Sequence, residues 1–314
     1  MRKLLQRLVL SAPVDGLLRR VRRRSPVILM YHGFCARGEA AGRLPASAFE
    51  AQADYLRRRH AVVPLARLLD ALAGGEPLPD NAVVITIDDG YRSVYEAAYP
   101  ILKRAGLPAS LFLVTGFLDR AEPLWTDRVT HAMGGDPDEP RVRAAMKALQ
   151  EAERLAALER LEKERGRALS LGAGCPDEYR PLEWPQVREM AASGLISIGS
   201  HTDTHPILTR CAPQDARREL ADSKRILEER LQAPCDLFCY PNGWHGDFDE
   251  STRTLLKELG YRCGITTVPG FTREGDDPYA LKRFGTDDEG ALDDFRRTFS
   301  LGRSWGRRMR AAMR

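Results

Sequence analysis

Long apolar runs are absent from this 314-residue sequence, and no stretch approaches the roughly 18 continuous apolar residues of a transmembrane helix. We therefore exclude an integral membrane protein. Cysteine is also sparse: six residues are spread along the chain and form no CxxC pair. A disulfide framework is typical of short secreted chains, so reduced thiols in a cytoplasmic setting are expected. Internal repeats and low-complexity tracts are absent as well.

The composition that remains is that of a folded protein. Hydrophobic residues make up 43% of the chain, which is enough for a large core and excludes a disordered protein. The length suits either two domains or one α/β barrel, which commonly reaches about 250 residues, with an insertion.

The charge is concentrated at the two ends of the chain. Residues 1–24 hold eight basic residues and one acid, and residues 296–314 hold seven arginines and no acid. Each end carries +7, so subtracting fourteen from the total of +4 leaves −10 on the 271 residues between them. A nucleic-acid groove would place basic residues across a folded face, so nucleic acid is not an expected partner.

The basic ends favour a peripheral contact with the anionic inner membrane surface. The alternative is a solvated tail at each end. Residues 1–24 lack the long apolar core of a signal peptide because Arg7 interrupts it. We therefore expect a cytoplasmic protein, for which peripheral contact with the inner membrane face and solvated tails are the two alternatives.

Short apolar runs alternate with stretches of helical periodicity. The runs predict buried parallel strands; they are Val27–Tyr31, Ala82–Ile87, Ser110–Val114, Leu195–Gly199, Leu237–Tyr240 and Cys263–Thr267. The predicted helices are Ser47–Arg59, Leu65–Ala73, Ser93–Ala105, Trp184–Ala192, Pro213–Leu231 and Ser251–Leu259. Ser47 and Glu50 have the spacing of a capping box, and Gly106 and Gly260 mark helix ends. This alternation predicts an α/β fold with a mostly parallel sheet, and six or seven such units suit a barrel better than a two-layer sheet.

Residues 117–181 interrupt the alternation. They contain Trp125, a turn cluster and a long charged helix near residues 141–167. We interpret them as a helical insertion, either a lid or a solvated surface helix. The predicted domains are thus a basic segment 1–24, a catalytic barrel 25–295 and a basic tail 296–314.

Two carboxylates follow the second strand, in the segment Thr86-Ile87-Asp88-Asp89-Gly90. Catalytic groups project from the carboxyl ends of barrel strands, so both could serve a site there. Taken alone, the segment could equally be a turn with solvated acids.

Two of the six histidines, His201 and His205, follow the strand Leu195–Gly199 and lie four residues apart. On a helical turn they would share a face and could hold one ion. Two histidines with one carboxylate and open positions form a catalytic metal site, for which zinc is the expected ion. A third strand end carries Cys239-Tyr240-Pro241-Asn242-Gly243, whose backbone N–H groups could hold an oxyanion or form an ordinary turn.

Together, TIDDG, SHTDTH and CYPNG resemble the three ordered motifs of the polysaccharide deacetylases, the carbohydrate esterases with the NodB homology domain. The resemblance runs from Val27 to Phe284 and implies an irregular α/β barrel with about seven parallel strands. It implies that Asp88 is the general base, and that Asp89, His201 and His205 bind a divalent metal, zinc or another transition metal. It also implies that the N–H of Asn242, beside Tyr240, helps to hold the oxyanion.

The sequence departs from the family in two places. The arginine of the third motif is Cys239 here, and Arg283 is either its substitute from another strand end or a surface residue. The usual late histidine motif for the general acid is absent. The segment Leu29-Met30-Tyr31-His32 is similar to the poly-N-acetylglucosamine deacetylase branch and implies that His32 is the acid, with His245 as the alternative. Trp125 and Asp127 are expected to line the sugar site, unless Trp125 only anchors the insertion.

The resemblance implies a metal-dependent hydrolase that removes an acetyl group from an N-acetylated sugar of a polysaccharide or a lipid-linked glycan. Within this class, a deformylase or an O-deacetylase acting on a lipid-linked sugar is the alternative. From another class, the chain could be a catalytically silent glycan-binding module on the same barrel.

Overall fold

Parallel β-strands form the centre of the protein, which is described here by a computed structural model over residues 24–35, 42–286 and 292–301. The strands of the main sheet run in the order β7-β6-β5-β1-β8, and β4 pairs with β5 at its start. Their bounds are β1 Val27–Tyr31, β4 Ala61–Val62, β5 Ala82–Ile87, β6 Ala109–Leu113, β7 Ile196–Ser200 and β8 Phe284–Gly285. A second small sheet pairs β2 (Phe34–Cys35) with β3 (Leu44–Pro45).

Single parallel bridges carry the pairing on from β7. Ser200 pairs with Phe238, Cys239 with Ile265, and Ile265 with Leu281, which lies three residues before β8. Since β8 pairs with β1, the pairings lead from β1 through six further chain segments back to β1, so seven segments take part. The predicted α/β fold of about seven parallel strands is confirmed. However, residues 237–240 and 263–267 form bridges instead of the strands that we predicted there.

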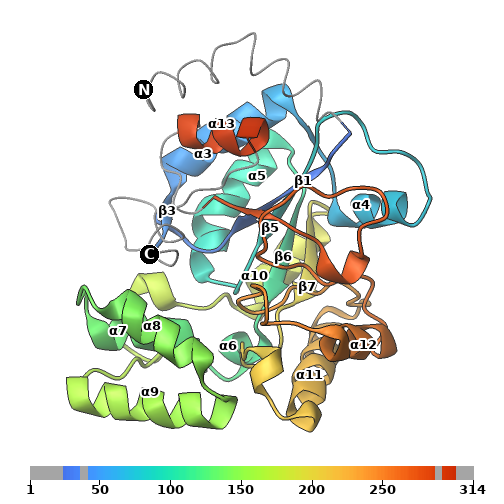
Figure 1. Ribbon diagram of the computed structural model, residues 1–314. Helices are drawn as coiled ribbons and strands as arrows, with labels where there is room; N and C mark the ends of the chain where they lie inside the picture. The colour runs from blue at the N-terminus through green and yellow to red at the C-terminus, as the bar shows by residue number, and fades with distance from the viewer. Residues whose placement is uncertain (1–23, 36–41, 287–291, 302–314) are drawn as a thin grey trace, which may run out of the picture.

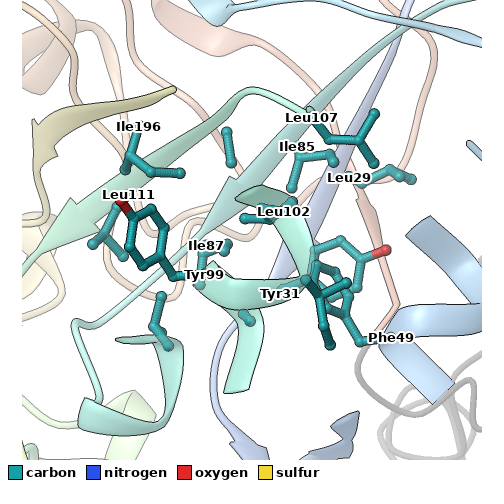
Figure 2. Packing of buried hydrophobic residues seen from close by; sticks show 14 of the residues in the cluster. Leu29, Tyr31, Phe49, Ile85, Ile87, Tyr99, Leu102, Leu107, Leu111 and Ile196 are labelled. Carbon is teal, nitrogen blue, oxygen red and sulfur yellow. The ribbon is translucent and has the colours of Figure 1, made fainter. Parts of the chain in front are cut away.

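Side chains alternate between two apolar clusters along the strands, as the pleat requires. Leu29, Tyr31, Ile85 and Ile87 pack with the helices that cover the outside of the sheet (Figure 2). The residues between them join a second cluster, whose members come from all parts of the ring: they include Ile28, Val84, Phe112, Leu237, Cys239, Ile265 and Leu281. The second cluster is therefore the interior of the ring.

Helices follow the strands closely to the predicted bounds. They are α3 Ala46–Arg59, α4 Leu65–Leu72, α5 Tyr99–Ala105, α6 Thr115–Asp119, α10 Trp184–Ala192, α11 Pro213–Leu231, α12 Glu250–Glu258 and α13 Leu292–Leu301. A π-helical turn over Val94–Ala98 precedes α5, and short 3₁₀ turns cover Asp177–Tyr179, Leu208–Arg210 and Pro278–Ala280.

Two of the predicted helix signals have different outcomes. Gly106 ends α5 in the left-handed conformation (φ 65°), as predicted for a residue without a Cβ atom. The capping box at Ser47 was wrong, because α3 begins one residue earlier and its N-cap is Pro45, which has no side-chain donor or acceptor.

The insertion folds into three helices instead of one long one. α7 (Trp125–Met133), α8 (Glu139–Ala148) and α9 (Glu151–Arg165) share a small apolar core that includes Trp125, Val129 and Leu158. In Figure 1 these helices lie together below the sheet, at the end where β6 leads into α6. The insertion therefore lies at the carboxyl ends of the strands.

The basic segments lie almost entirely outside the described residues. Residues 1–23 and 302–314 are not described, so the membrane contact and the boundaries at 24 and 296 stay predictions. Within the part of the chain that is described, no helix is long and apolar enough to cross a membrane.

Candidate active site

The two carboxylates occupy the end of β5. Asp88 is buried and continues the inward-facing alternation of Val84, and its N–H donates to the carbonyl of Tyr31 on β1 (2.8 Å). Asp89 follows with a positive φ of 74°, which turns the backbone away from the strand. This turn lets neighbouring residues of a strand serve one site, although the pleat alone would direct them to opposite faces.

Asp89 meets both histidines that follow β7. Its Oδ1 lies 3.5 Å from Nε2 of His201 and 3.5 Å from Nε2 of His205. Two ligands about 2.0–2.1 Å from one tetrahedral ion lie roughly 3.4 Å apart. The three side chains therefore have the spacing of ligands around one cation, and all three are buried.

A loop brings the histidines together, not the helical turn that we expected. Residues 201–205 are not helical, and Thr202 and His205 both have positive φ values, 67° and 63°. Glu219 on α11 fixes this loop by accepting hydrogen bonds from the N–H groups of Asp203 (2.9 Å) and Thr204 (2.8 Å). The expectation of a shared helix face was wrong, because two left-handed residues produce the convergence.

Hydrogen bonds and unpaired atoms define how these three residues could act. His201 Nδ1 lies 2.7 Å from the carbonyl of Cys239; an N–H there donates to the carbonyl and leaves Nε2 as a lone pair facing Asp89. Asp89 Oδ1 is buried and has no hydrogen-bond partner among the described residues. A buried acceptor without a partner is costly, and a cation would satisfy it.

Burial shifts the ionisation of the same residues. It raises the pKa of Asp89 to about 7, and the adjacent Asp88 carboxylate acts in the same direction. Burial lowers the pKa of His201 to about 4 and that of His205 well below its usual value. The histidines are therefore neutral ligands at neutral pH, and a cation would favour the ionised form of Asp89.

Arg283 lies fully buried inside the ring, against Asp88. Its Nη1 donates to Asp88 Oδ1 (2.8 Å) and its Nη2 to Oδ2 (2.5 Å), while Nε donates to the carbonyl of Thr266 (2.8 Å). Burial alone would raise the pKa of Asp88, but the Arg283 guanidinium outweighs it and holds that pKa well below its usual range. The surface alternative for Arg283 is wrong, because none of its side chain is exposed.

Cys239 stands where the family motif has arginine, and it touches the same ion pair. Its Sγ lies 2.9 Å from Arg283 Nη2 and 3.7 Å from Asp88 Oδ2. Arg283 is thus on a different strand end from the motif arginine, but its guanidinium contacts the carboxylate beside the motif position.

Of the two histidines considered as the acid, His32 lies beside Asp88. Its Nε2 is 3.9 Å from Asp88 Oδ2, and 30% of its side chain is exposed. His245 is exposed in the loop after Asn242, with its ring against Trp244.

The residues expected to contact substrate have different surroundings. Asn242 has a positive φ (60°), its carbonyl accepts from Thr267 Oγ1 (2.5 Å), and its side-chain Nδ2 is buried without a partner. The buried Tyr240 ring stacks on Phe248, and its hydroxyl donates to the carbonyl of Tyr279 (3.0 Å). These contacts make the Tyr240 side chain part of an apolar cluster.

Trp125 is 4% exposed and packs in the core of the insertion. This placement corresponds to the anchoring alternative, and it leaves little of the indole face free for a sugar ring. Trp244, two residues after Asn242, is 37% exposed.

Asp127, which we expected at the sugar site, belongs to a buried cluster that sequence reasoning missed. Tyr91 donates through its hydroxyl to Asp127 Oδ2 (2.8 Å), and the Arg43 guanidinium lies 3.7 Å from the centre of the Tyr91 ring. Arg43 Nη2 also lies 3.8 Å from Asp127 Oδ1. The cluster ties α7 of the insertion to the end of β5. Tyr91 follows the Asp-Asp-Gly motif directly, but no sequence pattern connects Arg43 to it.

Comparisons with known proteins agree with this architecture. The family model described as polysaccharide deacetylase matches residues 75–264. YxkH of Bacillus subtilis (strain 168), whose name describes it as a polysaccharide deacetylase, is 27% identical over 258 residues, covering 82% of this chain and 69% of YxkH.

Two further proteins are similar to this chain, one over a small part of its own length and the other over nearly all of it. The poly-beta-1,6-N-acetyl-D-glucosamine N-deacetylase of Escherichia coli (strain K12) is 30% identical over 157 residues, covering 50% of this chain and only 17% of that enzyme. The solved structure of IcaB from Ammonifex degensii has a TM-score of 0.63 and 23% identity, covering 88% of this chain and 98% of IcaB. This last likeness concerns the fold.

The Asp88–Arg283 pair generates a stability prediction. Arg283→Met leaves a carboxylate buried without compensation, so we expect the free energy of unfolding to fall by about 3–5 kcal/mol. Asp88→Asn in the same chain removes that charge, so the double variant should be more stable than Arg283→Met alone. Urea denaturation of the wild type, both single variants and the double variant measures the coupling. Additive effects would show that the two groups do not interact.

Proposed function

The chain belongs to the polysaccharide deacetylase family, and we propose from this premise that it removes an acetyl group from an N-acetylated sugar at the site formed by Asp88, Asp89, His201 and His205. One observation carries the proposal. Within the part of the chain that the structure describes, Asp89 Oδ1 is buried without a hydrogen-bond partner, and it lies 3.5 Å from both histidine Nε2 atoms.

The cofactor of this family is a metal, and the proposed ligands here are Asp89, His201 and His205. Two neutral imidazoles and one carboxylate suit zinc, with other divalent transition metals as alternatives. When bound, such an ion lowers the pKa of a water molecule and polarises the carbonyl oxygen of the amide.

Different side chains of the protein are proposed for the two proton transfers. Asp88 is the proposed base: Arg283 keeps it ionised, so it can accept a proton from the water that attacks the amide carbon. The N–H of Asn242 is the proposed donor to the oxyanion of the tetrahedral intermediate. The C–N bond then breaks, releasing acetate and a free amine.

His32 is the proposed acid, which donates a proton to the departing amine. The support is its position, with Nε2 3.9 Å from Asp88 Oδ2 and with part of its side chain exposed. Asp88, which accepts the proton of the attacking water, and His32, which donates a proton to the amine, are therefore neighbours.

We also propose what the substrate is: an N-acetylated sugar, from which the acetyl group is removed. The proposed carrier of the sugar is a polysaccharide or a lipid-linked glycan. The alternative activities to N-deacetylation are those of a deformylase or an O-deacetylase. Mass analysis of products from a panel of N-acetyl, N-formyl and O-acetyl sugars separates these activities. A protein that binds the panel with its metal present but releases no acid would be a silent binding module.

Removal of a metal ligand is the sharpest test of the site. We expect Asp89→Ala, His201→Ala and His205→Ala each to lose bound zinc, because each removes one of three ligands. Asp88→Asn should keep zinc and lose acetate release. Elemental analysis together with an acetate assay measures both effects. Stoichiometric zinc in the ligand variants, or normal turnover in Asp88→Asn, would contradict the assignment.

The acid assignment predicts unequal effects of two histidine substitutions. His32→Ala should reduce turnover about 10²–10⁴-fold and flatten the alkaline side of the pH profile, because no acid then remains to lose its proton. His245→Ala should leave the turnover close to that of the wild type. The reverse ranking, measured by acetate release across pH, would assign the acid to His245.

The exposed Trp244 is the proposed platform for the sugar ring, in place of Trp125. Aromatic side chains bury a large apolar face against a ligand, so Trp244→Ala should raise KM about tenfold with kcat little changed. Trp125→Phe is the matched control and should lower stability while leaving KM unchanged. A change of KM only in the Trp125 variant would refute the proposal for Trp244.

A further inference from the structure

The two histidines proposed as metal ligands are held in different ways. The Nδ1 of His201 lies 2.7 Å from the carbonyl oxygen of Cys239, so a hydrogen bond orients its ring from the side away from Asp89. The Nδ1 of His205 is buried and has no hydrogen-bond partner among the described residues. Metal-binding histidines usually have such a bond, which fixes the ring. The position of His205 therefore depends on the loop that carries it.

That loop has a conformation that it would not keep by itself. Thr202 and His205 both lie in the left-handed region, with φ values of 67° and 63°, and the N–H of His205 donates to Thr202 Oγ1 (3.0 Å). For residues that carry a Cβ atom, and above all for a β-branched residue, this backbone is unfavourable and persists only where neighbouring structure holds it. A loop released from its contacts would move His205 away from Asp89.

Glu219 of α11 supplies side-chain contacts that hold this loop. Its Oε2 accepts hydrogen bonds from the N–H groups of Asp203 (2.9 Å) and Thr204 (2.8 Å), and its Oε1 accepts one from Thr204 Oγ1 (2.7 Å). Hydrogen bonds to an ionised carboxylate are stronger than those between neutral groups. Three of them thus converge on the two residues that directly precede His205.

The start of α6 holds the loop from another direction. The N–H of Thr115 donates to the carbonyl of Thr202 (3.2 Å), and the N–H of Gly116 donates to the carbonyl of Asp203 (2.8 Å). Asp203 is therefore bonded to α6 through its carbonyl and to α11 through its N–H. The bonds to α6 are between backbone groups, whereas those to α11 need the carboxylate of Glu219. Removal of this carboxylate leaves the loop without its anchor on α11.

We propose that Glu219, which lies outside all three sequence motifs, is the positioning residue for His205 and thereby sets the affinity of the site for its metal. Glu219 is not among the side chains that meet at the site, so it acts through the loop. This inference rests on the proposed function, because it takes His205 as a metal ligand, and it adds a residue of α11 to the determinants of metal binding.

The zinc affinity of the full chain, measured by competition with a fluorescent chelator, tests the proposal. Glu219→Ala removes all three acceptor contacts, so we expect its Kd for Zn²⁺ to rise about 10–100-fold, the usual loss when a group that orients a metal ligand is removed. Glu219→Gln should bind Zn²⁺ nearly as well as the wild type, since its amide oxygen accepts from both N–H groups and its NH₂ donates to Thr204 Oγ1. An unchanged Kd in a folded Glu219→Ala variant would overturn the proposal.

Glu228, on the same helix, is the matched control. It accepts a hydrogen bond from the N–H of Cys235 (3.1 Å) and forms an ion pair with Lys224 (3.1 Å), so Glu228→Ala also frees a backbone N–H from its acceptor. Both alanine variants should melt below the wild type, but Glu228→Ala should bind Zn²⁺ with the wild-type Kd. Equal losses of zinc affinity in the two variants would show general destabilisation and would contradict a positioning role.

Glu219→Asp separates hydrogen-bond geometry from charge, and it carries the test if Glu219→Ala does not fold. Aspartate keeps the negative charge but is shorter by one CH₂ group, so it cannot reach all three donors at once. We therefore expect Glu219→Asp to bind Zn²⁺ more weakly than Glu219→Gln. The reverse order would show that the charge of Glu219 attracts the cation, and the positioning role would be wrong.

His205→Ala distinguishes a failure of this proposal from a failure of the proposed site. Loss of zinc from His205→Ala, together with a wild-type Kd in Glu219→Ala, would contradict the positioning role alone. Stoichiometric zinc in His205→Ala would contradict the proposed site and the positioning role with it. Loss of zinc from His205→Ala with a raised Kd in Glu219→Ala, rescued in Glu219→Gln, is the result that supports both.

Discussion

Two carboxylates lie buried side by side at the end of β5, and the rest of the site depends on how the charge of each is compensated. Asp88 receives a guanidinium through two hydrogen bonds from Arg283. No cationic side chain of the described residues is in hydrogen-bond contact with Asp89, and two neutral imidazoles face it instead. The same strand end therefore offers one permanently ionised acceptor and one incomplete coordination shell.

The barrel makes this arrangement possible because its parallel strands end at one rim. β5 delivers the carboxylates, β7 the histidines, β1 His32, and the segment before β8 Arg283. Left-handed residues at these ends, Asp89, His205 and Asn242, aim the groups inward at a cost in backbone energy. Strain of this kind is concentrated at functional sites, where the surrounding structure holds it in place.

The insertion lies at the same end of the barrel and has a small core of its own. Its own core and its satisfied ion pairs hold α7, α8 and α9 together, and the Tyr91–Asp127 hydrogen bond ties it to the end of β5.

The sequence by itself determined the alternation of strands and helices and the four residues at the ends of β5 and β7. Apolar runs of four to six residues with helical stretches between them identify a parallel fold without any knowledge of contacts. The motif residues are adjacent or four apart in the chain, so local pattern was enough to find them. Cys239 signalled only that the usual arginine was missing.

Tertiary structure decided everything that depends on residues far apart in the chain. Arg283 lies 195 positions from Asp88, and no periodicity could show that its side chain points inward. The choice between anchoring and sugar contact for Trp125 and the pairing of Arg43 with Tyr91 likewise depend on which segments pack together. A sequence specifies which groups a chain carries, but the burial and pairing that set their charge and reactivity exist only once distant segments meet.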